Sequence, residues 1–196
     1  MALVRRPPCI LGVGKNYQDH VNELGGERPQ QAVVFFKNPA SVIGNGEPIV
    51  ITPIARTPEL GVDYEGELAV VLGCDARDVP EAEALRVLSH VAVANDVSQR
   101  WWQWHGGGSQ WCRGKSFDSF CPLGDPPPIS GLDDLQDLQL TTRLNGKVMQ
   151  SARTGDLIFS VGETIAWFSR WYRFMPGDIV TTGSPDGVGY ARNPKV

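Results

Sequence analysis

The sequence is poor in the features that mark several large classes of protein. Its cysteines number only four, Cys9, Cys74, Cys112 and Cys121, and they form no CxxC pair. A zinc finger or a thioredoxin-like motif therefore has little support. The sequence also has no phosphate-binding loop ending in GK[ST] and no GxGxxG motif after a predicted strand. We expect the cysteines to be free thiols in a reducing compartment.

A strong charge of one sign and long apolar runs are missing as well. The formal net charge is −4, which leaves no basic footprint for a nucleic acid. No apolar stretch reaches membrane-spanning length. The opening MALVRRPPCILGVG lacks the long apolar core and the cleavage pattern of a secretory signal. We therefore expect no nucleic-acid or membrane partner and a cytoplasmic or mitochondrial location.

Turn-forming residues are abundant, with 22 glycines and 15 prolines among 196 positions. Between them lie short apolar, β-branched runs that predict strands, whereas helical spacing is rare. Strands are expected within 33–37, 45–52, 67–73, 91–96, 140–150 (a hairpin around Asn145 and Gly146) and 175–183, and helices at 17–24, 80–90 and 162–172. The stretch 100–114 is expected to be a loop. This pattern predicts one α+β domain that is mainly β.

Three acidic residues stand next to apolar strands. Glu65 and Glu67 are two positions apart, so on a strand both carboxylates point to the same side. Asp96 ends a second apolar strand and offers a third oxygen ligand. Three carboxylates without nearby sulfur or imidazole favour a hard cation, best Mg²⁺ or Mn²⁺, with Ca²⁺ as an alternative. The competing interpretation is a solvated strand face and an ordinary turn residue.

His20 and Glu23 form a second candidate constellation. Their i, i+3 spacing on a short helix places both side chains on one face, within reach of each other. A carboxylate beside an imidazole orients the ring and raises its basicity, which suits a base that activates water or moves a proton at carbon. The alternative is an ordinary surface pair.

Further polar and aromatic residues surround these two groups in the sequence. Lys115 lies among small and aromatic residues, where a lysine can bind a carboxylate or stabilise an oxyanion. Arg100 and Gln103 follow Asp96 closely, and Thr182 lies in the glycine-rich stretch TTGSPDGVG, so all three are candidates for substrate binding. Four tryptophans are candidates for a pocket wall, with core packing or an oligomer surface as the alternatives: Trp101, Trp102, Trp104 and Trp111.

The ordered motifs of the chain resemble those of the fumarylacetoacetate hydrolase family, most of all its domain-containing-protein branch. They are GVGKNYQDHVNE, VDYEGELAVVLG, NDVSQRWWQW, QWCRGKSFDSFCPLG, RLNGKVMQ and PGDIVTTGSPDGVG. The resemblance implies a mixed β-roll, a homodimer and a Mg²⁺ or Mn²⁺ site. It assigns the metal to Glu65, Glu67 and Asp96, catalysis to His20, Glu23 and Lys115, and substrate binding to Arg100, Gln103 and Thr182.

The same resemblance implies a small 2-keto acid substrate and a reaction through an enolate held by the metal. Acylpyruvate-type hydrolysis of a carbon–carbon bond is the first expectation, and tautomerisation or decarboxylation of oxaloacetate is the alternative. Residues 1–14 are expected to be a lead-in, and 15–196 a catalytic domain without the family's usual C-terminal strands. The strand near 179–182 should then lack partners. A catalytically inactive, truncated family member is the alternative of another class.

Overall fold

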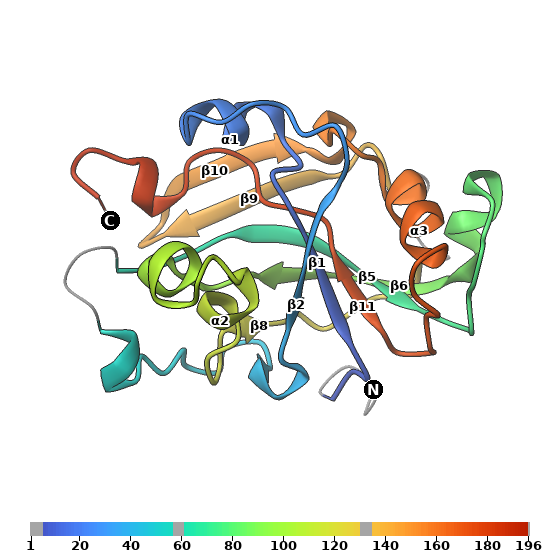
Figure 1. The fold of residues 1–196 in the computed structure, drawn as a ribbon, viewed down its shortest axis with the longest axis horizontal. Helices are drawn as coiled ribbons and strands as arrows, with labels where there is room; N and C mark the ends of the chain where they lie inside the picture. The colour runs from blue at the N-terminus through green and yellow to red at the C-terminus, as the bar shows by residue number, and fades with distance from the viewer. Residues whose placement is uncertain (1–5, 57–60, 130–134, 196) are drawn as a thin grey trace.

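A computed structural model describes residues 6–56, 61–129 and 135–195 of the chain (Figure 1). The strands are β1 Ile10–Gly14, β2 Val33–Lys37, β3 Val42–Ile43, β4 Val62–Asp63, β5 Gly66–Leu72, β6 Leu88–Asn95, β7 Ser98–Gln99, β8 Cys121–Pro122, β9 Gln139–Leu144, β10 Lys147–Arg153 and β11 Ile179–Thr181. The α-helices are α1 Gln18–Glu23, α2 Trp111–Lys115 and α3 Val161–Ser169. Short 3₁₀ turns are η1 Pro39–Ser41, η2 Pro53–Ala55, η3 Glu81–Val87, η6 Thr154–Asp156 and η7 Gly189–Ala191, and η4 Trp102–Gly106 is a π-helical turn. The predicted mainly β class with a few short helices is confirmed.

The central element is a five-stranded mixed sheet in the order β2-β1-β11-β5-β6. Strands β1 and β11 run parallel, and the other neighbours are antiparallel. Because β11 lies between β1 and β5, its backbone is paired on both sides; Ile179 N donates to Cys9 O, and Thr182 N donates to Leu68 O just beyond the strand. The expectation that this strand lacks partners is therefore wrong. Strand β1 lies within the predicted lead-in 1–14 and is an interior strand of this sheet.

The two faces of the sheet are covered by different cores, and the alternation along β5 decides which side chain enters which core. Leu68, Val70 and Leu72 pack with residues of α3, including Ile165 and Phe168, in the larger cluster. The residues between them, Ala69 and Val71, face the smaller second cluster on the opposite side. Helix α3 and η3 pack against each other at the end of the molecule away from α2 (Figure 1). The region around α2 is therefore left for a site.

Strand β6 completes the second face. Ala92 and Ala94 belong to the smaller cluster, and the antiparallel register places Glu67 of β5 directly opposite Ala94. Directly paired residues share a face of the sheet. Asp96, two positions after Ala94, is therefore directed to the same side as Glu67. The apolar second face thus ends in acidic residues from both strands.

Local turn and cap chemistry explains two elements that were expected from the sequence. Asn145 and Gly146 have φ angles of 51° and 81°, as a type I′ turn between β9 and β10 requires. Helix α3 begins after Ser160, whose hydroxyl accepts from Glu163 N while the Glu163 carboxylate accepts from Ser160 N. This reciprocal cap satisfies two backbone donors that a helix start leaves open.

Three local expectations are wrong. No strand forms within 45–52, where Ile49, Val50 and Ile51 are exposed. The stretch 80–90 is not an α-helix, because η3 is a series of 3₁₀ turns and β6 begins at Leu88; Leu85 is exposed. The stretch 100–114 is largely helical, comprising η4 and the start of α2, and not a loop.

Along residues 6–56, 61–129 and 135–195, no helix has the length and apolar character that crossing a membrane requires.

Candidate metal and substrate site

Three carboxylates converge at the end of the second sheet face. Glu65 directly precedes β5, Glu67 lies within it and Asp96 directly follows β6. One oxygen from each of these residues lies within 4.8 Å of the others, and all three side chains are buried. The backbone joins the two strand ends here as well, because Asp96 N donates to Glu65 O over 2.8 Å. The predicted acidic constellation therefore exists, and the interpretation as a solvated strand face is wrong.

Buried cations surround the triad. Lys115 Nζ from α2 donates to Glu65 Oε2 at 2.7 Å and to Asp96 Oδ2 at 2.5 Å. Arg100 donates to the other oxygen of Glu65 at 2.6 Å, and Lys37, the last residue of β2, donates to Asp96 Oδ1 at 2.6 Å. Ion pairs this deep are stable only when each charge is matched and hydrogen bonded. The carboxylates of Glu65 and Asp96 are therefore neutralised by cationic side chains of the protein itself.

Glu67 has a different environment from its two neighbours. Burial would raise the pKa of Glu65, but the charges of Lys115 and Arg100 outweigh it and hold that pKa well below its usual range. Burial also raises the pKa of Glu67, and there the nearby charges of Asp96 and Glu65 add to the effect. The Glu67 carboxylate accepts a hydrogen bond from Gly183 N at 2.8 Å. Negative charge is thus least compensated at Glu67.

The predicted His20–Glu23 pair is present. Both residues lie on α1, and His20 Nδ1 is 2.7 Å from Glu23 Oε1. The second Glu23 oxygen accepts from Gly187 N at 2.9 Å, so the carboxylate is held from two sides. With Glu23 accepting the Nδ1 proton, the Nε2 atom of a neutral His20 ring carries the free lone pair. The Glu23 carboxylate therefore fixes the orientation of the imidazole ring.

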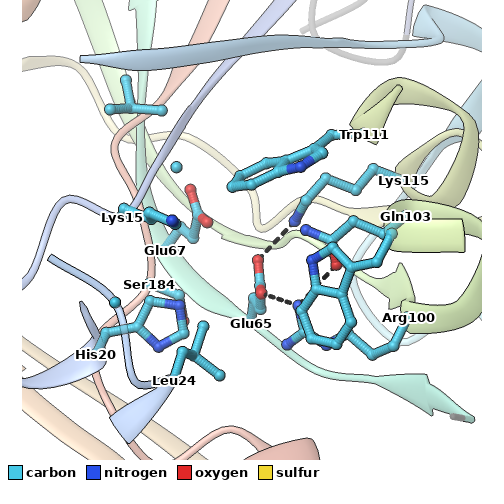
Figure 2. A pocket seen from close by; sticks show the side chains of 14 residues that line it. Lys15, His20, Leu24, Glu65, Glu67, Arg100, Gln103, Trp111, Lys115 and Ser184 are labelled. Carbon is cyan, nitrogen blue, oxygen red and sulfur yellow. Dashed lines mark hydrogen bonds and ion pairs between the residues drawn. The ribbon is translucent and has the colours of Figure 1, made fainter. Parts of the chain in front are cut away.

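A cavity of about 330 Å³ brings the acidic group and the His20 side chain together. Figure 2 shows Glu65 and Glu67 in its centre, His20 and Leu24 on one side, and Lys115, Arg100 and Gln103 on the other. Trp104 and Trp111 also line the wall, which confirms a pocket position for two of the four tryptophans. The volume lies at the lower end of the usual range for small-molecule sites.

Sequence comparison then assigns the chain to a family. The profile described as Fumarylacetoacetate (FAA) hydrolase C-terminal matches residues 9–196. The chain belongs to the fumarylacetoacetate hydrolase family. The resemblance expected from the ordered motifs is therefore confirmed.

The names of related proteins describe several different activities. Oxaloacetate tautomerase FAHD2A, mitochondrial, from Homo sapiens is 39% identical over 199 residues, covering 100% of this chain and 62% of its own length. The chain thus spans less than two thirds of that relative. A 5-carboxymethyl-2-hydroxymuconate delta-isomerase from Mycobacterium smegmatis superposes with a TM-score of 0.82 at 39% identity, covering 94% of this chain and 70% of the other.

A third family member has been solved with ligands. The fumarylpyruvate hydrolase from Pseudomonas aeruginosa, in complex with Mn²⁺ and pyruvate, superposes with a TM-score of 0.83 at 29% identity. The match covers 94% of this chain and 80% of the hydrolase. All three comparisons span nearly the whole of this chain, so its fold is the family fold.

The donor set of this family member fits a hard divalent cation. Glu65, Glu67 and Asp96 supply only oxygen ligands, which Mg²⁺ and Mn²⁺ prefer. The raised pKa of Glu67 has the repulsion of two carboxylates among its causes, and a cation between the three would relieve that repulsion. These three residues are therefore the ones that would hold a metal.

The three residues predicted to bind substrate differ in their position relative to the cavity. Gln103 lines the cavity and accepts from Arg100. Arg100 also lines it, but its guanidinium is bound to Glu65 and to Asp63, the latter through two donors at 2.9 and 2.7 Å. Thr182 is not on the cavity wall; its hydroxyl donates to Leu68 O at 3.0 Å. That contact gives no support to the prediction that Thr182 binds substrate, and Ser184 lines the cavity instead.

Sequence reasoning missed two buried charges that organise the site. Lys37 pairs with Asp96, and Asp63 accepts from Arg100 and from the backbone of Gly189 and Tyr190. Signals for both were present: Lys37 closes an otherwise apolar strand, and Asp63 precedes Glu65 by the same two-residue step that joins Glu65 to Glu67. A lysine on a buried strand requires a buried partner, and the triad supplies it.

One segment near the end of the chain contacts all parts of the site. Backbone N–H groups of Gly183, Gly187 and Gly189 donate to Glu67, Glu23 and Asp63, respectively. These carboxylates belong to the triad, the His20 pair and the Arg100 network. The glycine-rich loop that contains the substrate-binding candidate Thr182 therefore holds carboxylates of the protein itself.

Proposed function

We propose that this chain acts on the enolisable carbonyl of a small 2-keto acid with the help of a divalent cation. The observation that carries the proposal is the buried triad of Glu65, Glu67 and Asp96 in one cavity with an oriented His20. Such a combination provides a place for an electrophile and a base within one small, partly enclosed volume.

Mg²⁺ is the proposed cation, with Mn²⁺ as the alternative, because three carboxylates and room for water suit an octahedral oxygen site. When bound, the cation supplies Lewis-acid polarisation of the substrate carbonyl. The presence of Mn²⁺ and pyruvate in the Pseudomonas aeruginosa fumarylpyruvate hydrolase supports a divalent cation and a 2-keto acid as the ligands of this cavity.

In this proposal His20 moves the proton. Glu23 holds Nδ1, so Nε2 is the atom that takes a proton from carbon or from a water molecule. Gly187 N fixes the Glu23 carboxylate and thereby the direction of the ring. Lys115 and Arg100 keep Glu65 ionised, as the lowered pKa of Glu65 indicates, and so preserve a full negative charge for the cation.

Keto–enol tautomerisation of oxaloacetate is the reaction we place first. It needs one base at carbon and a polarised carbonyl, and His20 and the triad offer these. The human oxaloacetate tautomerase that aligns with the whole chain supports this assignment. Hydrolysis of an acylpyruvate is the second candidate, supported by the fumarylpyruvate hydrolase and by the suitability of His20 for activating water.

The test is turnover by the purified chain. The loss of oxaloacetate enol absorbance and the cleavage of acylpyruvates should be followed with Mg²⁺, with Mn²⁺ and after chelation. We expect catalysis of the oxaloacetate reaction that chelator abolishes and Mg²⁺ restores. Catalysis that persists without metal would contradict the proposal. Absence of any turnover in a chain that melts cooperatively would favour the inactive alternative.

His20→Ala sharpens this test, with His105→Ala as the matched control because His105 is exposed and outside the cavity wall. Loss of a general base lowers kcat by roughly 10²- to 10⁴-fold. We expect that loss for His20→Ala, unchanged Mn²⁺ affinity in both variants, and ordinary kcat in the control. Collapse of Mn²⁺ affinity in His20→Ala would make His20 a ligand and contradict its role as base.

The predicted homodimer stays a prediction, for which light scattering at several protein concentrations is the measurement. A mitochondrial location is the proposed one of the two that were expected. The names of the human and bovine tautomerase relatives support it.

A further inference from the structure

The basic side chains on the cavity wall differ in whether a carboxylate already holds them. Arg100 and Lys115 are bound to acidic residues at 2.5–2.9 Å, and His20 is bound to Glu23. Lys15 also lines the cavity, yet no carboxylate within the described ranges lies at ion-pair distance from its ammonium. Lys15 is thus the cavity cation that the protein leaves available.

The backbone fixes Lys15 in place. Its φ of 57° is left-handed, a conformation that costs a lysine about 1–2 kcal/mol. The preceding Gly14 is paired with Val33 of the neighbouring strand. The following Asn16 is held through its side chain, which donates to Phe159 O at 3.0 Å and to Thr182 O at 2.7 Å. An unfavourable backbone angle held by its neighbours is typical of functional positions.

The side chain approaches the acidic group from its own side of the cavity. In Figure 2, Lys15 is drawn on the same side of the cavity as His20, across from Lys115, Arg100 and Gln103. A 2-keto acid whose keto and carboxylate oxygens lie at the triad would extend its remaining carbons away from the triad. An ammonium on a flexible stem can meet an anionic group there.

We propose that Lys15 binds the distal carboxylate of a dicarboxylic 2-keto acid and so selects diacids over monoacids. This inference rests on the proposed function, because it assumes that a 2-keto acid occupies the cavity. Lys15 acts in binding and takes no part in proton transfer. Its removal should raise KM for oxaloacetate and leave kcat nearly unchanged.

The direct test compares two stable ligands that share a carbon chain and differ in one terminal carboxylate, 2-oxoglutarate and 2-oxopentanoate. Their affinities should be measured by calorimetry on the whole chain in the presence of Mn²⁺. The variants are Lys15→Met, Lys15→Arg, and Lys147→Met as a control at an exposed lysine outside this cavity. A thermal melt of each variant verifies that it is folded.

We expect the wild type to prefer 2-oxoglutarate by about tenfold, the size of one charge-assisted contact. Lys15→Met should lose this preference without weakening 2-oxopentanoate, whereas Lys15→Arg and Lys147→Met should keep it. An unchanged ratio in folded Lys15→Met would overturn the role of Lys15 and leave the proposed function standing. Failure of both ligands to bind the wild type would overturn the proposed function and this inference together.

Discussion

At the scale of single residues, the three carboxylates of the site differ in how far neighbouring cations balance their negative charge. Glu65 and Asp96 each accept hydrogen bonds from buried cations, whereas Glu67 accepts from one backbone N–H group and faces two carboxylates. The pKa of Glu67 is raised by burial first and by these neighbours second. Contact with Glu67 should therefore contribute most to the binding energy of a divalent cation. Substitution of Glu67 is for this reason the most sensitive test of metal binding.

Glu67→Gln should weaken Mn²⁺ binding while the fold stays intact. The amide keeps an oxygen for Gly183 N and removes only the charge. Loss of residues that merely orient metal ligands costs roughly 10- to 100-fold in affinity, and loss of a ligand's charge should cost at least as much. Calorimetric titration with Mn²⁺ measures it. Glu83→Gln, at an exposed glutamate on η3, is the control, and equal affinities in the two variants would argue against the triad.

Lys115→Met should lower stability as well as activity. Its ammonium is bound to Glu65, Asp96 and Ser98, so the variant leaves two buried carboxylates without that partner. Breaking a buried ion pair by removing one member costs about 3–5 kcal/mol. Urea unfolding without metal measures the loss. Lys147→Met, at an exposed position of β10, should stay close to wild type. Equal stability of both variants would mean that the buried network relaxes at little cost.

At the scale of elements, the segment from Gly183 to Tyr190 connects parts of the site that come from different strands and helices. Its N–H groups donate to Glu67 on β5, Glu23 on α1 and Asp63 on β4. Gly187 has a φ of 96°, and a Cβ added there would lie 2.1 Å from Met149 O. Only glycine satisfies both conditions without displacing the strand that carries Met149.

Gly187→Ala should therefore reduce kcat by releasing Glu23. The comparison is Gly46→Ala, where φ is also positive, at 77°, but nothing lies within 4 Å of an added Cβ. Both substitutions incur left-handed backbone strain of about 1–2 kcal/mol. Only Gly187→Ala also forces the backbone to move at the His20–Glu23 pair. Turnover of oxaloacetate and thermal melts should separate these effects, and an unchanged kcat in Gly187→Ala would show that Glu23 keeps its position without this donor.

At the scale of the whole molecule, the sheet joins the first and last parts of the chain. Strand β11 lies between β1 and β5, and both faces of the sheet carry apolar clusters that include β11 residues, Val180 on one side and Ile179 on the other. The site is located where the second apolar face gives way to acidic strand ends. Its geometry thus depends on pairing between segments that are far apart in sequence.

This arrangement predicts strong hydrogen-exchange protection at Ile179, Val180 and Thr181. These residues are buried and paired on both sides, so their amides should exchange only through large-scale opening. Ile49, Ile51 and Thr52 lie outside any strand and should exchange rapidly in the same experiment, whereas the Val50 amide donates to Ser119 Oγ. Rapid exchange at β11 would mean that the central pairing opens locally.

Periodicity and turn chemistry in the sequence determined most elements correctly. The β9–β10 hairpin follows from Asn145 and Gly146, and helix α3 follows from its capping residues, because both depend on neighbours in the chain. Predictions for segments whose conformation depends on packing were wrong. Apolar residues 49–51 do not form a strand because no strand in the described part of the chain pairs with them, and 100–114 is helical because η4 and α2 pack on each other.

For the site, the sequence by itself determined its chemistry: three carboxylates with strand spacing and a His20–Glu23 pair with helical spacing. Both rest on fixed local geometry. Only the tertiary structure decided which cationic side chains are bound to carboxylates of the protein and which one is left to bind a ligand. Lys37 and Asp63 are drawn into buried ion pairs, and the Thr182 hydroxyl is bound to the backbone. Lys15 faces the cavity, and no carboxylate among the described residues lies at ion-pair distance from it. The pairing of charges depends on distances across the sheet, which spacing along the chain does not encode.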